Sequence, residues 1–415
     1  MKKLFALLLV VLMVVSMAAC GKKKAEFTGE EELAPIAAKD LKVGFIFLHD
    51  EQSTYDKNFI DAAKEACKNM GVTMVQKTQI PESKACYDAA IELIEVEGCG
   101  LIFADSFGHE SFLMEAAAEH PDVQFCHATG TMAHNGGTKY AFEVKNFNNA
   151  FAHIYQGRYA AGVVAGLKLK EMIDAGTITA DKAKMGYVGA FTFAEVISGY
   201  TSFYLGAKSI VPEVTMDVKF TGSWYDETKE KQAAQSLIDG GCVLISQHAD
   251  SMGAPTACEA AGVPNVSYNG STASACPETF LVSSRINWVP YFEYMIQQRI
   301  DGKPIDADWA GTIETGSVVL TELGKNVAAG TEAKLNEVLA GLKNGTINVF
   351  DTNNFTVKGE KLTSYKADVD TDEAYAKDTE VIANGIFQES KFRSGPYFDI
   401  EIDGINLLDT NYGDN

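Results

Sequence analysis

Short apolar runs alternate with stretches of helical periodicity from Lys42 onward. The apolar runs predict strands at 42–48, 73–80, 100–106 and 123–130, and the periodic stretches predict helices near 55–70, 83–97 and 109–119. This alternation is typical of βαβ units on a parallel sheet. A second series begins with a long helix in 149–175 and continues with strands at 184–190, 215–220, 242–249 and 265–269. The pattern therefore predicts an α/β chain with two similar halves.

Local signals reinforce several of these elements. Asp226 is a plausible N-cap for a helix over 226–239, which Gly240 and Gly241 would end. An aromatic-rich stripe at helical spacing predicts a core-facing helix, and its members are Trp288, Tyr291, Phe292, Met295 and Ile296. Further along the chain we expect a strand at 312–320, a helix at 331–344 and a hairpin around 354–366.

The N-terminal segment has the pattern of an export signal. In MKKLFALLLVVLMVVSMAAC, two lysines precede an apolar run that is too short for a comfortable membrane span. The small residues ahead of Cys20 resemble the lipobox of bacterial lipoproteins, in which that thiol receives acyl chains such as palmitate. We expect a lipoprotein signal peptide at 1–20, lipid attachment at Cys20 and a flexible tether at 21–39. An ordinary signal peptide or an N-terminal helix is the alternative.

Composition narrows the classes of partner. The 415 residues are 46% hydrophobic and 22% charged, enough for one or two cores, and the formal net charge is −21. Nucleic acid is not an expected partner, because phosphate backbones are bound by clustered Lys and Arg. The seven cysteines after Cys20 include no C-x-x-C spacing, and we expect them to behave as small hydrophobes rather than metal ligands or disulfides.

Chemistry-bearing side chains follow the ends of the predicted strands. Ligands of open parallel sheets bind beyond the carboxyl ends of the strands, so these positions are the candidate binding residues. The candidates combine aromatic rings with carboxylates and amides, which suits a flat heterocycle that carries hydroxyl groups. They are Asp50, Thr54, Tyr55, Asp56, Ser106, Phe107, Phe191, Phe193, Trp224, His248, Asp250 and Asn269. His49 and Glu195 occupy similar positions. A phosphorylated ligand fits poorly, since nearby charges are mostly negative and there is no Walker-A motif.

Plainer interpretations exist for several of these residues. Asp50, Asp56 and Asp226 could simply cap helices. His49, His109 and His248 are not spaced as a local metal-binding pair, so loop histidines are favoured and no metal or cofactor is expected. The DVDTDE run at 368–373 lacks the glycine and glutamate of a calcium loop.

Three segments resemble one known family, the basic membrane protein family of ABC-transporter substrate-binding lipoproteins, whose members include purine nucleoside receptors. They are NAFAHIYQGRYAAGVVAGLKL (149–169), KMGYVGAFTFAEV (184–196) and VLISQHADSMGAPTACEAAGVPNVSYN (243–269). The resemblance implies a type I periplasmic-binding-protein fold, with two Rossmann-like lobes joined by three crossovers and a ligand cleft between them. On this basis we expect a first lobe at 40–148 plus 284–305, a second lobe at 149–283 plus 306–345, and a C-terminal extension at 346–415 of unassigned lobe.

The resemblance also implies roles for individual residues. Tyr55 stands where the family has an aromatic ring that stacks on the base, and Asp50 where it has an acidic residue facing the purine edge. Phe191 or Phe193 would close the sandwich from the second lobe. Asn269 replaces the aspartate that grips ribose hydroxyls, an exchange that removes a charged acceptor.

The predicted function is therefore a lipid-anchored receptor on the outer face of the cell membrane. It would capture a purine nucleoside or similar flat molecule by hinged closure and deliver it to ABC permease subunits, without acting as an enzyme. Riboflavin or another heterocycle is an alternative ligand. An exported nucleoside N-glycosidase and a sensory module feeding a membrane partner are alternative functions.

Overall fold

The computed structural model describes residues 33–133, 144–369 and 376–410. The expected signal peptide at 1–20, the lipid-attachment residue Cys20 and most of the expected tether at 21–39 lie outside the described residues. No helix among the described residues is long and apolar enough to cross a membrane.

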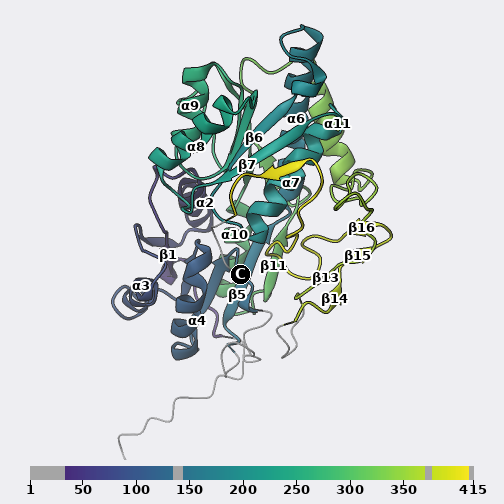
Figure 1. The fold of residues 1–415 in the computed structure, drawn as a ribbon. Helices are drawn as coiled ribbons and strands as arrows, with labels where there is room; N and C mark the ends of the chain where they lie inside the picture. The colour runs from purple at the N-terminus through teal and green to yellow at the C-terminus, as the bar shows by residue number, and fades with distance from the viewer. Residues whose placement is uncertain (1–32, 134–143, 370–375, 411–415) are drawn as a thin grey trace, which may run out of the picture. The chain divides into compact units, whose positions relative to one another are not determined.

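The first sheet has six strands, and every neighbouring pair in it is parallel. Their spatial order is β11-β5-β4-β3-β1-β2, and Figure 1 labels β1, β5 and β11. The strands are β1 (Lys42–Ile46), β2 (Thr73–Lys77), β3 (Leu101–Ala104), β4 (Gln124–Ala128), β5 (Phe147–Ala152) and β11 (Asp308–Gly311). The associated helices are α2 (Thr54–Met70), α3 (Lys84–Glu95), α4 (Glu110–Glu119) and α10 (Val289–Asp301), with short 3₁₀ turns η1 (Ala38–Asp40) and η2 (Phe107–His109). We call this group the first lobe.

The second sheet has seven strands in the order β12-β10-β9-β8-β6-β7-β17, with only β12 antiparallel to its neighbour. The strands are β6 (Lys184–Gly189), β7 (Thr215–Phe220), β8 (Leu244–His248), β9 (Asn265–Tyr268), β10 (Phe280–Ile286), β12 (Val318–Leu320) and β17 (Ile405–Leu407). The associated helices are α6 (Ile154–Asp174), α7 (Ala194–Lys208), α8 (Glu227–Asp239), α9 (Gly253–Ala261) and α11 (Thr331–Lys343), with the 3₁₀ turn η3 (Ala180–Lys182). This group is the second lobe.

The chain passes between the two sheets three times within its main body, after β5, after β10 and after β11. Sheet membership differs from the expected lobe boundaries at each of these places. The boundary at 148 falls inside β5, the boundary at 284 falls inside β10, and β11 joins the first sheet although 306–345 was expected in the second lobe. The apolar pattern of a strand next to a crossover predicts the strand but does not reveal which sheet it joins.

Three predicted elements are wrong in detail. The expected helix over 149–175 begins only at Ile154, because residues up to Ala152 form β5. The buried amides of this strand hid it: Asn149 donates to Glu110 at 2.9 Å, so polar residues stand where a strand usually shows an apolar run. The expected strand at 312–320 is a turn followed by β12, and the expected hairpin at 354–366 is reduced to one bridge between Val357 and Glu360.

The aromatic stripe at the start of α10 is part of the first-lobe core, as predicted. Its five side chains are at most 1% exposed. The Trp288 ring stacks on Phe59 of α2 with centroids 4.5 Å apart, and Phe292 meets Phe103 of β3 edge-on at 4.8 Å. Such pairs add to the free energy of burial, so the stripe fixes α10 and α2 against the sheet that carries the site.

Helices α6 and α7 approach each other closely at two glycines. A Cβ on Gly162 would collide with the carbonyl oxygen of Phe203, and one on Gly206 would collide with the carbonyl of Tyr159. Only glycine leaves room for backbones at this separation. The glycine-punctuated segment at 149–169 is therefore explained by helix packing.

The C-terminal extension packs on the second lobe. Phe350, Phe355 and Phe398 belong to the core cluster of that lobe, and β17 pairs in parallel with β7 at the edge of its sheet (yellow in Figure 1). The backbone N–H of Ser394 also donates to Asp308 of β11 at 2.6 Å. The extension thus contacts both lobes. It also contains two short antiparallel pairs, β13 (Lys366–Ala367) with β14 (Thr379–Glu380) and β15 (Ile382–Ala383) with β16 (Ile386–Phe387).

All seven cysteines after Cys20 are buried and unpaired. Burial raises their thiol pKa values, to about 12 at Cys126 and Cys242. The interpretation of these residues as small hydrophobes is confirmed.

Candidate functional site

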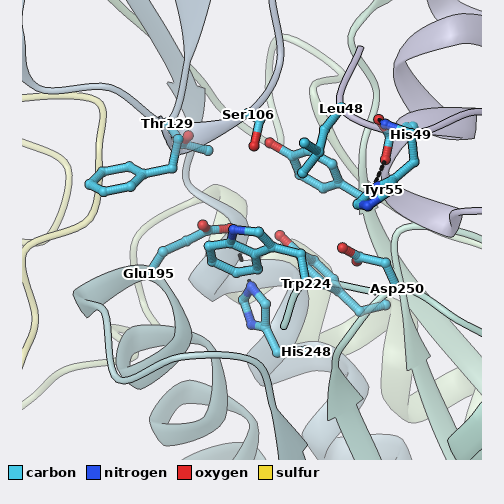
Figure 2. A pocket seen from close by; sticks show the side chains of 12 residues that line it. Leu48, His49, Tyr55, Ser106, Thr129, Glu195, Trp224, His248 and Asp250 are labelled. Carbon is cyan, nitrogen blue, oxygen red and sulfur yellow. Dashed lines mark hydrogen bonds and ion pairs between the residues drawn. The ribbon is translucent and has the colours of Figure 1, made fainter. Parts of the chain in front are cut away.

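A cavity of about 360 Å³ lies between the lobes, beyond the carboxyl ends of the strands. Figure 2 shows its labelled side chains in two facing groups, one from each lobe. The lining residues are Leu48, His49, Tyr55, Asp56, Ser106, Phe107 and Thr129 from the first lobe, and Glu195, Trp224, His248, Asp250 and Tyr268 from the second. The location is the one expected for a ligand of parallel sheets.

Tyr55 is held in the first-lobe wall by the start of α2. Ser53 caps this helix, since its Oγ accepts from the backbone N–H of Asp56 at 3.1 Å. The Tyr55 hydroxyl donates to the carbonyl of Asp105 at 2.7 Å, and its ring meets Phe59 edge-on at 4.8 Å. Both contacts restrict the ring, so it forms a fixed part of the wall.

Asp56, which lines the cavity, and Asp105, which lies behind the wall, form a buried acidic pair. Burial alone would raise the pKa of Asp56, but hydrogen bonds from His49 and Ser53 outweigh it and lower that pKa. The donors are the His49 backbone N–H at 2.7 Å and the Ser53 hydroxyl at 2.6 Å. Burial, together with the charge of Asp56, raises the pKa of Asp105 well above its usual value. The lowered pKa of Asp56 and the raised pKa of Asp105 favour the ionised form of Asp56 and the protonated form of Asp105.

The second-lobe wall places an aromatic ring opposite Tyr55. Trp224 follows β7 and is supported edge-on by Phe191, with ring centroids 4.9 Å apart. Its carbonyl accepts from the backbone N–H of Asp250 at 3.0 Å. Burial, reinforced by nearby acidic groups that include Asp56, Glu230 and Glu195, raises the pKa of Asp250 well above its usual value. A ligand that donates a hydrogen bond to Asp250 would favour its ionised form.

Direct contacts join the two lobes at the edge of the cavity. The Thr54 backbone N–H donates to the carbonyl of Asp250 at 2.9 Å. Phe107 and Phe193 meet across the lobes with ring centroids 5.2 Å apart, and His49 and Tyr225 do so at 5.4 Å. The structure is therefore that of a closed cleft.

A wider compartment of about 1110 Å³ adjoins the cavity and shares four of its lining residues, Phe107, Thr129, Glu195 and Trp224. The C-terminal extension supplies one side, through residues that include Lys377, Arg393 and Tyr397. The Lys377 ammonium is paired with Asp399 at 2.6 Å, and the Arg393 guanidinium donates to three backbone carbonyls. These two cations are already committed to the protein.

Seven of the twelve candidate binding residues line the cavity. They are Tyr55, Asp56, Ser106, Phe107, Trp224, His248 and Asp250. Phe193 lines the adjoining compartment, whereas Phe191 supports Trp224 and Thr54 bonds to Asp250.

Asp50 and Asn269 do not line the cavity. The Asp50 carboxylate accepts from the backbone of Gln52 at 3.0 Å and from the side chain of Gln79 at 2.9 Å. Asn269 is buried with a φ of 66°, and its amide nitrogen has no hydrogen-bond partner among the described residues. It lies beside the Asp250 carboxyl group.

Five lining residues were not among the twelve. Leu48 and Tyr268 lie within predicted strands, and no signal in the sequence distinguishes them from strand residues outside the site. Thr129 follows the fourth strand and could have been found by the same rule as the others. His49 and Glu195 met that rule without being selected.

The chemistry of the cavity favours an uncharged or cationic ligand with hydrogen-bond donors. Asp56, Asp250 and Glu195 line it, and none of its twelve lining residues is Lys or Arg. Anionic groups such as phosphate would meet carboxylates without a compensating cation. Among the described residues, no group of three or more His, Cys, Asp or Glu could hold a metal ion.

Solved structures with the same architecture include solute-binding proteins of ABC transporter systems. A solute-binding protein of an ABC transporter system from Conexibacter woesei has a TM-score of 0.57 at 20% identity, covering 74% of this chain and 98% of that one. One from Aeropyrum pernix has a TM-score of 0.60 at 15% identity, covering 74% and 92%. The fold is the type I periplasmic-binding-protein fold, with two lobes joined by a hinge.

Sequence comparison then identifies the family. Residues 46–353 match the Bmp family, described as ABC transporter substrate-binding protein PnrA-like. The chain belongs to this family, so it is a substrate-binding protein of the ABC-transporter type, as the resemblance implied.

Curated relatives carry different ligand names. A purine-binding protein of Brucella abortus is 32% identical over 76% of this chain and 84% of its own length. A Haloferax volcanii protein named as glucose-binding is 31% identical over 55% of this chain. The nucleoside-binding protein BmpA of Lactococcus lactis is 24% identical over 53% of it. The match spans only 53% of the length of the Haloferax volcanii protein and 58% of the length of the Lactococcus lactis protein.

Proposed function

We propose that this protein is the extracytoplasmic receptor of an ABC importer and that it captures a purine base or purine nucleoside by closure of its two lobes. The observation that carries the proposal is the enclosed cavity, with Tyr55 and Trp224 on facing walls and carboxylates around them. Facing aromatic rings bury the two faces of a flat heterocycle, and the carboxylates accept hydrogen bonds from its edge.

The relatives' names support this ligand class without deciding it. Among the relatives compared, the one whose match covers most of both chains is named as purine-binding. A second is named as glucose-binding, and aromatic rings with carboxylates also suit sugars. Glucose is therefore the informative competitor, together with riboflavin.

The receptor acts by binding and releases its ligand unchanged. The Asp56 carboxylate accepts hydrogen bonds from His49 and Ser53, and burial together with the Asp56 charge raises the pKa of Asp105 behind the wall. Neither carboxyl group is thus placed to activate a water molecule as a general base. The N-glycosidase alternative requires such a base, and Glu195 is the lining carboxylate at which a turnover assay with nucleosides would test it.

A thermal-shift panel tests the ligand assignment. The purified protein is heated with adenine, hypoxanthine, adenosine, inosine, guanosine, riboflavin or glucose. A ligand at one hundred times its Kd adds about 2.7 kcal/mol to the free energy of unfolding. We expect stabilisation by purines. Stabilisation by glucose or riboflavin alone would overturn the purine assignment.

We also propose that a lipid on Cys20 anchors the receptor at the membrane and that ABC permease subunits receive its ligand. The basis for the anchor is the lipobox-like sequence that ends at Cys20. Labelled palmitate should be incorporated into the protein in bacterial cells and not into Cys20→Ala. Equal labelling of both would refute the anchor.

A further inference from the structure

A fully buried arginine lies behind the second-lobe wall without a carboxylate partner. Arg158 of α6 is 0% exposed, and it takes part in none of the ion pairs found among the described residues. Its guanidinium donates to the Tyr187 hydroxyl, to the carbonyl of Gln247 at 3.3 Å and to that of Ser267 at 3.4 Å. The face of Tyr268 lies 4.8 Å from its Cζ. Burying a charge without a charged partner is costly, so the contacts of this arginine point to a role in the site.

The donor-only guanidinium of Arg158 at one end and the acceptor-only carboxylate of Glu195 at the other together fix the direction of the hydrogen bonds between them. Arginine can only donate, so the Tyr187 hydroxyl accepts from it and turns its own proton towards His248 Nδ1, 3.3 Å away. Nδ1 is then an acceptor, and the imidazole proton is on Nε2. That nitrogen lies 3.2 Å from Glu195 Oε1 and donates to it. The order is Arg158, Tyr187, His248, Glu195, and the last two line the cavity.

Packing holds the His248 ring in this position. A Cβ on Gly199 of α7 would lie 2.8 Å from Nδ1, so the glycine gives the imidazole its space. Tyr268 of β9 packs against the other side, with ring centroids 4.5 Å apart. The charged or titratable groups around the ring are Tyr187 from β6, Glu195 from α7, Arg158 from α6, Tyr268 from β9 and Asp250 after β8. Burial, assisted by the Arg158 charge, lowers the pKa of His248, although Glu195 opposes this.

We propose that Arg158, Tyr187 and His248 form a positioning relay that aims Glu195 into the cavity as a hydrogen-bond acceptor. One carboxylate oxygen of Glu195 is taken by His248. The hydrogen bonds and ion pairs found for Glu195 among the described residues involve Oε1 alone, so we assign the other oxygen to an N–H or O–H group of the ligand. The relay therefore makes the wall selective for a flat heterocycle that places a donor there. This inference rests on the proposed function, because it assigns a recognition role within the same site.

A pair of Tyr→Phe variants isolates the relay from packing. Tyr187→Phe removes the hydroxyl that links Arg158 to His248 and keeps the ring. Tyr200→Phe is the matched control, because Tyr200 packs on Tyr187 and is 1% exposed, but its hydroxyl has no partner among the described residues. We expect Tyr187→Phe to weaken binding of the tightest purine by about tenfold and Tyr200→Phe to leave it unchanged.

Glu195→Gln tests the acceptor itself, and we expect it to weaken binding by at least about tenfold, since bonds to charged acceptors are the stronger ones. If the relay acts through Glu195, adding Tyr187→Phe to Glu195→Gln should cost little further affinity. Independent losses that add in full would overturn the relay.

The ¹⁵N chemical shifts of His248 test the relay without any ligand. They should report the Nε2–H tautomer in the ligand-free protein and a changed tautomer distribution in Tyr187→Phe. An Nδ1–H tautomer in the parent protein, or shifts unaffected by Tyr187→Phe, would overturn the relay. Absence of purine binding by the parent protein would instead overturn the proposed function, whatever the tautomer.

Discussion

Replacement of Tyr55 tests the stacking wall, because the contacts of its ring and its hydroxyl can be separated. Tyr55→Phe keeps the ring against Phe59 and loses the 2.7 Å bond to the Asp105 carbonyl. Removing one hydrogen bond of this kind costs about 1 kcal/mol of unfolding free energy. The ring remains available for a ligand, so we expect a lower Tm and nearly unchanged purine affinity.

Tyr55→Ala removes the ring itself. Stacking contributes about 1 kcal/mol beyond area burial, and covering one face of a purine, on the order of 50 Å², adds roughly another 1 kcal/mol. We therefore expect a loss of about 2 kcal/mol, which corresponds to an increase of about thirtyfold in Kd.

Isothermal titration calorimetry on the three proteins measures these differences. Tyr87→Ala is the control, since Tyr87 is on α3 outside the cavity and its hydroxyl bonds to Glu119 at an exposed position. Should Tyr55→Ala unfold cooperatively and still bind purine within about twofold of the parent Kd, the stacking role of Tyr55 would be refuted.

Three further predictions concern closure and buried acids. A Cβ on Gly270 would lie 3.6 Å from Cβ of Thr54 in the other lobe, so the larger side chain of Gly270→Phe should hold the two lobes apart. Calorimetry should then show loss of ligand binding at a nearly unchanged Tm. A Kd equal to that of the parent protein would contradict this. Asp105 holds its proton, so the isosteric Asp105→Asn should unfold at a Tm close to that of the parent at pH 6, and a large fall in Tm would show that the ionised form is needed. Burial raises the pKa values of Glu230 and Glu389 to about 7, so between about pH 4.5 and 7 the folded protein keeps protons that the unfolded chain has released. The free energy of unfolding should therefore fall as the pH rises through this range, by up to about 3 kcal/mol for each group. Urea titrations in which it rises instead would refute the assignment.

Much of the fold could be predicted because its main elements carry strong local signals. The helix at 226–239 is an example: Asp226 caps it, accepting from the Lys229 N–H at 2.9 Å, and Gly240 follows its last residue. The stripe that begins at Trp288 could be predicted equally well, since five apolar residues at helical spacing indicate a helix that faces the core.

The missed elements depend on tertiary partners. Strand β5 satisfies its buried asparagines through distant groups such as Glu110, and its sequence has no alternating apolar pattern. Strand β17 has three residues and exists because β7 leaves an edge open to it. Neither relation can be read from a local window of sequence.

The sequence predicted where the cavity lies and only part of its lining. The strand-end rule found Tyr55, Trp224 and Asp250 because they follow strands. It could not rank Glu195 above Asp50, since that choice depends on whether a carboxylate turns towards the cavity or towards its own loop. The role of Arg158 was also invisible, because the hydrogen bonds that define it join four separate elements.

Equilibrium dialysis with labelled purines tests the central claim most directly. The purified protein is dialysed against labelled adenine, adenosine or guanosine, and the retained ligand is released by denaturation and identified by chromatography. The account predicts saturable retention of one purine molecule per chain, recovered chemically intact. Retention of none of them, or recovery of a nucleoside split into base and sugar, would contradict it.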